Sequence, residues 1–300
     1  MVIETTKISV YSICRNEEAS CRVAWESVKD ADELVVVIDS RTSDNTEEIA
    51  REFTDKIYHF DWSESFSEMK NFAASMCSHN WVFHLGGAKT LEEGGIEKMR
   101  SIIHEHGDAH DSFLVKLVSK TVSEHSHYLP HLYRKDNVEY SGAIHEVITD
   151  TGFYAGDVVI TWGQNPNHKA DPDRNMRILK KEVAKITNGA RWKFYLAREY
   201  YYRNDWEKSF NLFSEYIKIS KFKAEKGDAY LLASKCLFQL GRGNEAREHC
   251  LRSIEINPDH EEALRFMADL HYEPWKRKWL QFADMAENNG VLFVVKRANL

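Results

Sequence analysis

Two clusters of charged and hydroxyl-bearing residues each follow a short apolar run near the start of the chain. Residues 14–18 (CRNEE) follow ISVYSI, and residues 39–46 (DSRTSDNT) follow ELVVVI. A carboxylate that closes such a run, as Asp39 does, accepts hydrogen bonds from a ribose or a base. Turns rich in Ser, Thr and Asp before a helix offer backbone N–H groups to phosphate. These residue types indicate a nucleotide, although the start of any helix favours the same residues.

Alternating apolar and amphipathic stretches must position these clusters. Four runs are rich in β-branched and aromatic residues and too short for helices, so they predict strands: Ile8–Cys14, Glu33–Asp39, Lys56–Phe60 and Trp81–Leu85. Helices are expected near 17–30, 45–54 and 66–77, and capping pairs are expected at Asp44 with Glu47 and at Ser65 with Glu68. The alternation predicts an α/β fold with a doubly wound, mainly parallel sheet, which binds ligands at the carboxyl ends of its strands.

From about residue 174 the pattern becomes helical. Ser209 and Phe213 recur as Ala246 and Cys250, at a spacing of 37, and a degenerate third unit is expected over 261–288. This spacing is close to the tetratricopeptide length of about 34 residues. The sequence therefore predicts a nucleotide-binding domain (1–170), a connecting helix (171–190) and an all-α helical repeat domain (191–300).

Composition limits the class of protein. With 300 residues, 43% of them hydrophobic, the chain can bury a sizeable core, which excludes a disordered protein. No run approaches the roughly 20 apolar residues of a membrane span, and MVIETTKISV lacks signal-peptide features, so a cytoplasmic protein is expected. The five cysteines form no CxxC pair, and reduced thiols are expected.

Charge differs between the two halves. Residues 1–165 carry 15 Lys and Arg against 28 Asp and Glu, whereas residues 166–300 carry 25 against 19. The basic segment 275–279 (WKRKW) is compatible with nucleic acid or another polyanion. Helical repeats routinely bury aromatic residues and expose lysines, so a core with a solvated face is favoured, and a protein or peptide partner is expected.

Taken in order, the motifs resemble a known family. ISVYSICRNEE, ELVVVIDSRTSDNTEEIA and FDWSESFSEMKNFAASMCSHNWVFHL are similar to the nucleotide-sugar-binding region of family-2 inverting glycosyltransferases of the GT-A fold. The similarity is closest to a bacterial branch with tetratricopeptide helices behind the catalytic domain. It continues through 132–134 (LYR), 142–146 (GAIHE) and 174–175 (RN). The resemblance implies transfer of a sugar from a nucleoside diphosphate sugar, with a UDP-sugar as the first candidate.

The same resemblance assigns roles to individual residues. Asp39 is expected to hold the nucleoside, and Arg15, Glu17 and Asp44 to shape its pocket. Lys70 and Asn71 stand where the family has Arg-Asn near the diphosphate. A cation there offsets the negative charge that grows on the leaving diphosphate. A surface salt bridge is the alternative for Arg15 and Lys70.

The chain departs from the family at the metal site. Where the family has Asp-Ala-Asp-Glu, whose carboxylates hold Mg²⁺ or Mn²⁺, residues 86–89 are Gly86, Gly87, Ala88 and Lys89. The family also has a histidine at the end of a later strand, and here Trp162 takes its place. Two losses in separate segments predict one abandoned metal site, so a divalent ion is not expected to be held in the usual way.

Three explanations of this departure stay open. Lys89 can replace the metal as a fixed positive charge on phosphate. Other carboxylates, such as Glu92, Glu93 or Asp111, can recruit a metal from new positions. Alternatively, the domain no longer transfers sugar and serves as a nucleotide-binding or protein-binding scaffold.

An inverting transfer needs a general base for the acceptor hydroxyl. Glu146 is the first candidate, with Asp136 and Glu139 as weaker ones, and His145 can orient the acceptor or act as the base itself. An ordinary ion pair is the alternative for Glu146. Histidines at 125 and 127 would share one face of a strand, but with His131 they are expected to face solvent or the acceptor cleft rather than a metal.

The acceptor is expected to be a protein, peptide or other polymer that the helical repeats position. Glycosylation of a modified nucleic-acid base is a further alternative, which would require salt-dependent DNA binding by the basic half.

Overall fold

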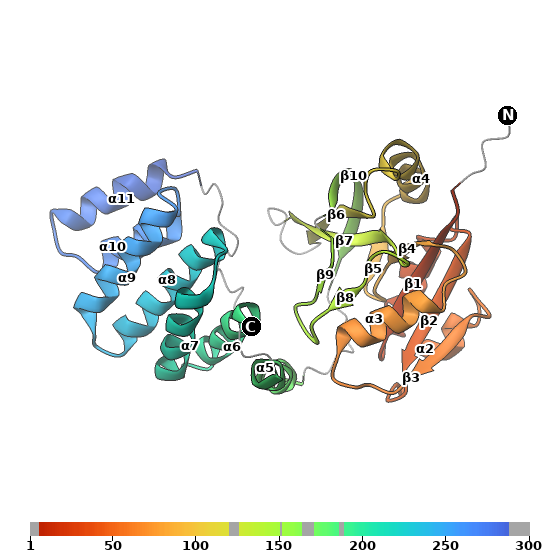
Figure 1. The fold of residues 1–300 in the computed structure, drawn as a ribbon, viewed down its shortest axis with the longest axis horizontal. Helices are drawn as coiled ribbons and strands as arrows, with labels where there is room; N and C mark the ends of the chain where they lie inside the picture. Colours follow the sequence, from red (N-terminus) through yellow and green to blue (C-terminus); the bar gives the residue numbers. More distant parts are fainter. Residues whose placement is uncertain (1–5, 120–125, 151, 164–170, 186–188, 288–300) are drawn as a thin grey trace. The chain divides into compact units, whose positions relative to one another are not determined.

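The computed structural model describes residues 6–119, 126–150, 152–163, 171–185 and 189–287. The chain divides into two compact units, Met1–Asp171 and Pro172–Leu300, each of which is described by itself (Figure 1). His125, which was expected to share a strand face with His127, lies outside the described residues.

A mixed eight-stranded sheet forms the centre of the first unit. Its strands are β1 (Ile8–Cys14), β2 (Glu33–Asp39), β3 (Ile57–Phe60), β4 (Trp81–His84), β5 (Lys89–Leu91), β6 (Ser112–Ser119), β7 (Ser126–Arg134) and β10 (Phe153–Trp162), and β8 (Tyr140–Ser141) pairs separately with β9 (Val147–Ile148). The strand order is β3-β2-β1-β4-β7-β6-β10-β5. The first four strands are mutually parallel, as predicted, and β7 joins them antiparallel to β4.

Helices cover both faces of the sheet. One core contains residues of α1 (Cys21–Glu26), α2 (Thr46–Ala50) and α4 (Gly95–His106), and the opposite core contains residues of α3 (Phe66–Ser75). Neighbouring residues of β2 alternate between the cores, with Val36 in the first and Val37 in the second. Burial on both sides explains why this strand reads as an unbroken apolar run.

The helix starts agree only in part with the capping prediction. Ser65 is the N-cap of α3 and accepts a hydrogen bond from the N–H of Glu68 at 3.2 Å, which confirms that pair. The N-cap of α2 is Asn45 rather than Asp44, so that prediction was wrong by one residue. Asp44 instead accepts the N–H of Thr46 at 3.1 Å from outside the helix.

The order of the sheet reverses beside β1. The chain runs outward through β2 and β3, then returns to place β4 on the other side of β1. Ligands of open α/β sheets bind at the carboxyl ends of strands at such a reversal. Residues 14–18, 39–46 and 86–89 follow β1, β2 and β4, so all three predicted segments lie at this carboxyl edge (Figure 1).

Seven helices are described in the second unit: α5 (Arg174–Lys185), α6 (Ala190–Tyr202), α7 (Trp206–Ile219), α8 (Lys223–Gln239), α9 (Gly243–Ile256), α10 (Glu261–Asp269) and α11 (Trp275–Met285). The last six form three consecutive contacting pairs, as the repeat predicts. The Ser209 hydroxyl donates to the carbonyl of Ala197 at 2.9 Å, and one period later the Ser234 hydroxyl donates to the carbonyl of Ala246 at 2.5 Å. The same bond therefore recurs with donor and acceptor helices exchanged.

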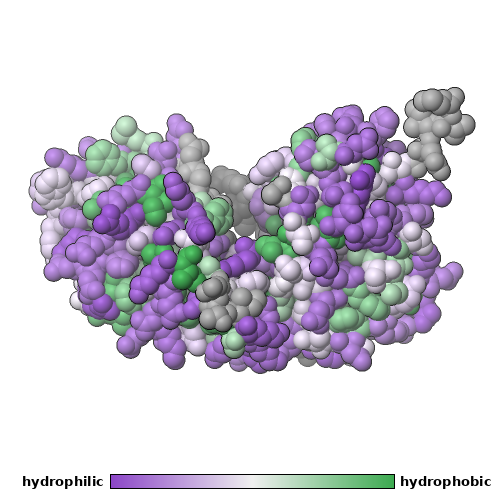
Figure 2. Space-filling view, viewed as in Figure 1, coloured by the Kyte–Doolittle hydropathy of each residue, from purple (hydrophilic) through white to green (hydrophobic). Residues whose placement is uncertain are grey.

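The face in Figure 2 is mostly hydrophilic in each unit, with small separate apolar patches. Trp279 packs against a buried cluster, but Trp275 is 58% exposed, so the expected burial of the WKRKW aromatics is wrong for Trp275.

All five cysteines are free and buried. Within the described ranges no helix is long and apolar enough to cross a membrane.

Candidate active site at the carboxyl edge of the sheet

Hydrogen bonds join the loops after β1 and β2. The Glu17 N–H donates to the Thr46 hydroxyl at 2.8 Å, and the Glu18 N–H donates to Asp44 at 3.1 Å. Asp44 therefore holds the two loops together. Its carboxylate accepts backbone N–H groups, so it fixes the path of the chain at this edge. Arg15, on the first loop, is exposed.

Asp39 closes β2 as a buried carboxylate. It accepts the backbone N–H and the Nε–H of Arg41, both at 2.9 Å, and the Arg41 guanidinium also lies over the Trp62 ring, 5.4 Å from its centroid. Burial alone would raise the pKa of Asp39, but the hydrogen bonds from Arg41 and the charge of Arg15 outweigh it and lower the pKa. Asp39 is thus a charged acceptor at neutral pH.

Glu17 and Gly87 meet at the point where the sheet order reverses. A Cβ added at Gly87 would lie 2.9 Å from Cγ of Glu17, so only glycine allows this close approach. A Cβ at Gly86 would meet only Cδ of Lys89, at an ordinary 3.9 Å. The predicted residues of the first and fourth strand ends are therefore in contact.

The two positions where the sequence is predicted to depart from the family's metal site lie side by side. Lys89 and Trp162 are directly paired in the antiparallel β5–β10 ladder, and the Gly163 N–H donates to the carbonyl of Ala88 at 3.4 Å. Directly paired residues of such strands hold their Cβ atoms about 5 Å apart. The segment 86–89 and Trp162, which the sequence analysis singled out separately, thus lie at one place in the fold.

Lys89 is a partly buried cation on strand β5. Among the described residues, its ammonium has no hydrogen-bond or ion-pair partner. Burial, and then the charge of Lys70, lower the pKa of Lys89 to about 8, although the charge of Glu146 acts in the opposite direction. A buried cation without an anion is costly, which marks this place as suited to an anionic ligand.

Lys70 and Glu146 form an ion pair close to Lys89. Their side chains are only 12% and 15% exposed, and the Lys70 ammonium also lies 4.4 Å from the centroid of the Tyr140 ring. Burial would raise the pKa of Glu146, but the charge and hydrogen bond of Lys70 outweigh it and lower the pKa. Lys70, predicted to lie near the diphosphate, and Glu146, predicted as the general base, are therefore in direct contact.

Asn71 positions the aromatic floor of this pair. Its amide donates to the carbonyl of Tyr140 at 2.8 Å and accepts the N–H of Tyr140 at 2.9 Å. Because both ends of the amide bind backbone, Asn71 fixes β8 on α3. His145, beside the base, has a left-handed backbone (φ 52°), and the Phe66 N–H anchors its loop by donating to the carbonyl of Ala143 at 2.8 Å.

A row of buried aromatic rings lies beneath the lysines. His84 stacks between Tyr11 and His131, with ring centroids 5.1 Å apart in both pairs. Burial, and then the charges of Lys70 and Lys89, hold the pKa of His84 well below its usual range, and the same causes act on His131. Sequence reasoning missed His84. Its signal is the alternation in β4, which places His84 on the same face as Val82 in the α3 core.

The residues at this edge do not fit the divalent cation that the family implies. Gly86, Gly87 and Ala88 have no side-chain oxygen, and Lys89 adds a positive charge where the cation would lie. Over the described residues, no group of three His, Cys, Asp or Glu side chains is placed to hold a metal.

The alternative carboxylates are placed elsewhere. Glu92 accepts the N–H of Val159 at 2.8 Å and pairs with Lys98 at 2.9 Å. Asp111 pairs with Arg134 at 3.3 Å, and Glu93 is exposed. The structure does not bring these three carboxylates together.

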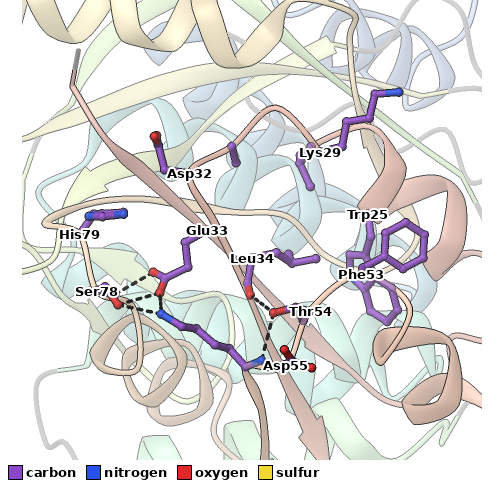
Figure 3. A pocket seen from close by; sticks show the side chains of 13 residues that line it. Trp25, Lys29, Asp32, Glu33, Leu34, Phe53, Thr54, Asp55, Ser78 and His79 are labelled. Atoms are coloured by element: carbon purple, nitrogen blue, oxygen red, sulfur yellow. Dashed lines mark hydrogen bonds and ion pairs between the residues drawn. The ribbon is translucent and has the colours of Figure 1, made fainter. Parts of the chain in front are cut away.

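A pocket of about 580 Å³ lies at the opposite, amino edge of the sheet. Figure 3 shows Glu33, at the start of β2, facing Ser78. The Glu33 carboxylate also forms an ion pair with Lys56. Trp25 and Phe53 form its aromatic wall, with ring centroids 5.8 Å apart. None of the predicted site residues lines this pocket.

Comparisons with known proteins indicate the family to which the chain belongs. Residues 9–159 match the family model described as glycosyl transferase family 2. An uncharacterized glycosyltransferase of Rickettsia typhi is 31% identical over 113 residues, which are 37% of this chain and 38% of that protein. The prophage-derived glycosyltransferase SunS of Bacillus subtilis is 22% identical over 264 residues, which are 80% of this chain and 60% of that protein.

The helical unit has its own relative. A TPR repeat-containing protein of Synechococcus elongatus is 31% identical over 85 residues, 28% of this chain and 21% of that protein. The matched regions cover only 38% to 57% of the length of the first rickettsial relatives. The family match spans half of the chain and includes every strand of the parallel half of the sheet. The chain therefore belongs to glycosyl transferase family 2, with a GT-A-like α/β unit followed by helical repeats of the tetratricopeptide type.

Proposed function

We propose that this chain transfers a sugar from a nucleoside diphosphate sugar, with UDP-sugars as the first donors to test, and that Lys89 replaces the divalent cation of the family. One observation supports the proposal: the partly buried Lys89 ammonium has no ion-pair partner among the described residues, and Lys89 pairs with Trp162, the other position where the sequence is predicted to depart from the family's metal site. A fixed lysine interacts with phosphate as a point charge.

The chemistry then follows from this chain's own residues. Asp39 accepts hydrogen bonds from the nucleoside, and Lys70 and Lys89 lie against the diphosphate. Glu146 takes the proton of the acceptor hydroxyl as the acceptor oxygen bonds to the anomeric carbon. The bond from that carbon to the diphosphate oxygen breaks, and its electron pair leaves with the diphosphate. The two ammonium groups offset the charge that grows there.

The acceptor is proposed to bind the helical repeats. Repeat arrays present extended surfaces that suit peptides and other polymers. This part of the proposal is tested separately, because donor chemistry at the sheet does not depend on it.

Thermal unfolding with UDP tests the donor site. We expect UDP to raise the unfolding temperature equally in EDTA and in Mn²⁺. Asp39→Ala should abolish the shift, whereas Asp55→Ala, an exposed aspartate at the opposite edge, should leave it unchanged. A shift that requires Mn²⁺ would disprove the replacement of the metal. No response to any nucleotide would instead support the scaffold alternative.

A further inference from the structure

Three charged side chains at the carboxyl edge are unbalanced. Lys70 and Lys89 carry two positive charges, and Glu146, paired with Lys70, carries one negative charge. We propose that Glu146 is an internal counter-anion that occupies Lys70 until the donor diphosphate displaces it, so that the base becomes available only when donor is bound. This inference rests on the proposed function.

The charge balance supports displacement. A nucleoside diphosphate sugar carries one negative charge on each phosphate, which matches the two ammonium groups once Glu146 has left Lys70. If Glu146 stayed on Lys70, the site would hold three negative charges against two positive ones. Since like charges confined at low dielectric repel strongly, the diphosphate and Glu146 compete for the same lysine.

Burial makes this competition selective. Breaking a buried ion pair leaves an uncompensated charge and is strongly unfavourable, so Lys70 exchanges Glu146 only for another anion. The Lys70 ammonium keeps one fixed neighbour during the exchange, because Asn71 clamps Tyr140 beneath it. The lysine thus stays in place while its anion changes.

The backbone around Glu146 allows the carboxylate to be the part that moves. Glu146 lies between a turn and the two-residue strand β9, and the turn contains two left-handed residues, Gly142 (φ 87°) and His145 (φ 52°). Lys70, by contrast, projects from the ten-residue helix α3. A short turn offers more freedom than a capped helix packed on the sheet.

Displacement changes protonation as well as position. Lys70 is the strongest charge that keeps Glu146 ionised, with a smaller effect of His145. The other groups around the site are Lys89, the phenol of Tyr140 and the histidines His84 and His131. When the diphosphate neutralises Lys70, the pKa of Glu146 rises, which makes it a stronger base and predicts proton uptake on donor binding near pH 5.

Calorimetric titration tests the competition. Removing the internal anion with Glu146→Gln should tighten the binding of inorganic pyrophosphate about tenfold. The matched control Glu48→Gln removes an exposed carboxylate of α2 and should leave the affinity unchanged. In the double variant Lys70→Met/Glu146→Gln the gain should vanish, because the contested lysine is gone. This neutral pair also leaves no unpaired charge of its own, so it guards against misfolding of the single variant.

A second measurement needs no substitution. UDP-glucose, whose phosphates do not titrate between pH 4 and 8, is titrated into the unaltered protein in buffers of different ionisation enthalpy. We expect net proton uptake near pH 5, larger than in Glu146→Gln, which lacks the carboxylate that takes up the proton. Unchanged pyrophosphate affinity in Glu146→Gln together with equal proton uptake would overturn the displacement and leave the proposed function standing. Failure of pyrophosphate, UDP-glucose, UDP-galactose and UDP-N-acetylglucosamine to bind at any pH would overturn both.

Discussion

The two edges of the sheet each hold a lysine paired with a buried carboxylate, and the pairs differ in how fully they are satisfied. At the amino edge Glu33 accepts hydrogen bonds from Lys56, from the hydroxyl of Ser9, and from the N–H and hydroxyl of Ser78, the last two at 2.7 Å. At the carboxyl edge Glu146 has Lys70 as its only cation partner among the ion pairs that the structure describes.

The difference distinguishes a structural ion pair at the amino edge from the proposed binding site at the carboxyl edge. At Glu33 one carboxylate is saturated with donors and no cation is left over, so the pair stabilises the fold. At Glu146 a second lysine, Lys89, lies close by, and no ion pair of Lys89 is found in the part of the chain that the structure describes. Excess buried charge stabilises nothing in the protein alone, and such surplus is typical of a site that binds a ligand.

The largest effect is expected for the surplus lysine. Lys89→Met should lower sugar transfer, or the release of UDP from a UDP-sugar, about 100-fold, because it removes charge stabilisation in the transition state. The free energy of unfolding should stay equal or rise, since a partly buried unpaired charge is lost. Lys89→Arg, which keeps the charge, should retain part of the activity. If Lys89→Met turned over donor as fast as the unaltered protein, Lys89 would have no role in the reaction.

The saturated pair should behave in the opposite way. Glu33→Gln should lower the free energy of unfolding by about 2 kcal/mol, because it removes the partner of Lys56 and weakens three hydrogen bonds. Nucleotide binding should not change, since no predicted site residue lies at this edge. Chemical denaturation and UDP titration of the same samples measure both effects.

Glu33 also makes a prediction about acid stability. Burial alone would raise the pKa of Glu33, but its hydrogen bonds from Lys56, Ser9 and Ser78 lower it to about 2 from 4.5. Because the folded pKa lies below the unfolded one, the stabilisation is present above pH 4.5 and is lost as the pH falls toward 2. In Glu33→Gln the free energy of unfolding should change less with pH between about 4.5 and 2.

The pH dependence of catalysis reports on Lys89. Its pKa of about 8 means that the ammonium of the free protein is lost as the pH rises through that value. We expect kcat/KM to fall about tenfold per pH unit above pH 8. Lys89→Arg should move this limb to higher pH, because guanidinium stays charged. If kcat/KM of Lys89→Arg still fell above pH 8, the fall would be due to the titration of a group other than Lys89.

The smallest effect is expected in the glycine segment. Gly87→Ala should lower the free energy of unfolding by about 1 kcal/mol, because its Cβ would meet the stem of Glu17 at 2.9 Å. Gly86→Ala serves as the control, because its Cβ would lie at an ordinary 3.9 Å from Cδ of Lys89. Equal stability of the two variants would show that Glu17 yields without cost.

The sequence predicted the parallel half of the fold because its strands are buried on both faces and read as unbroken apolar runs. Strand β7 was not predicted from its residues, since its first four residues are exposed and Pro130 interrupts it. Only the end of β10, near Trp162, was expected, because a register shift between Ala155 and Val159 interrupts the strand. In the helical unit the 37-residue spacing was enough, because each repeat depends mainly on its neighbours.

The site was predictable where it follows strand ends, as for Asp39, Glu17 and the segment 86–89. The pairing of Lys70 with Glu146 was not, because 76 positions separate them and only the packing of α3 on β8 brings them together. The contact of Lys89 with Trp162 likewise depends on the β5–β10 register. Local spacing in the sequence could not predict either of these contacts, because both depend on which distant segments pack together.

Donor turnover without metal tests the central claim most directly. UDP release from UDP-glucose, UDP-galactose and UDP-N-acetylglucosamine is measured after treatment with EDTA and again with added Mn²⁺. If Lys89 supplies the charge at the diphosphate, the donor that reacts is turned over at the same rate in both conditions, and Lys89→Met is slow in both. Turnover that stops in EDTA and returns with Mn²⁺ would contradict the account.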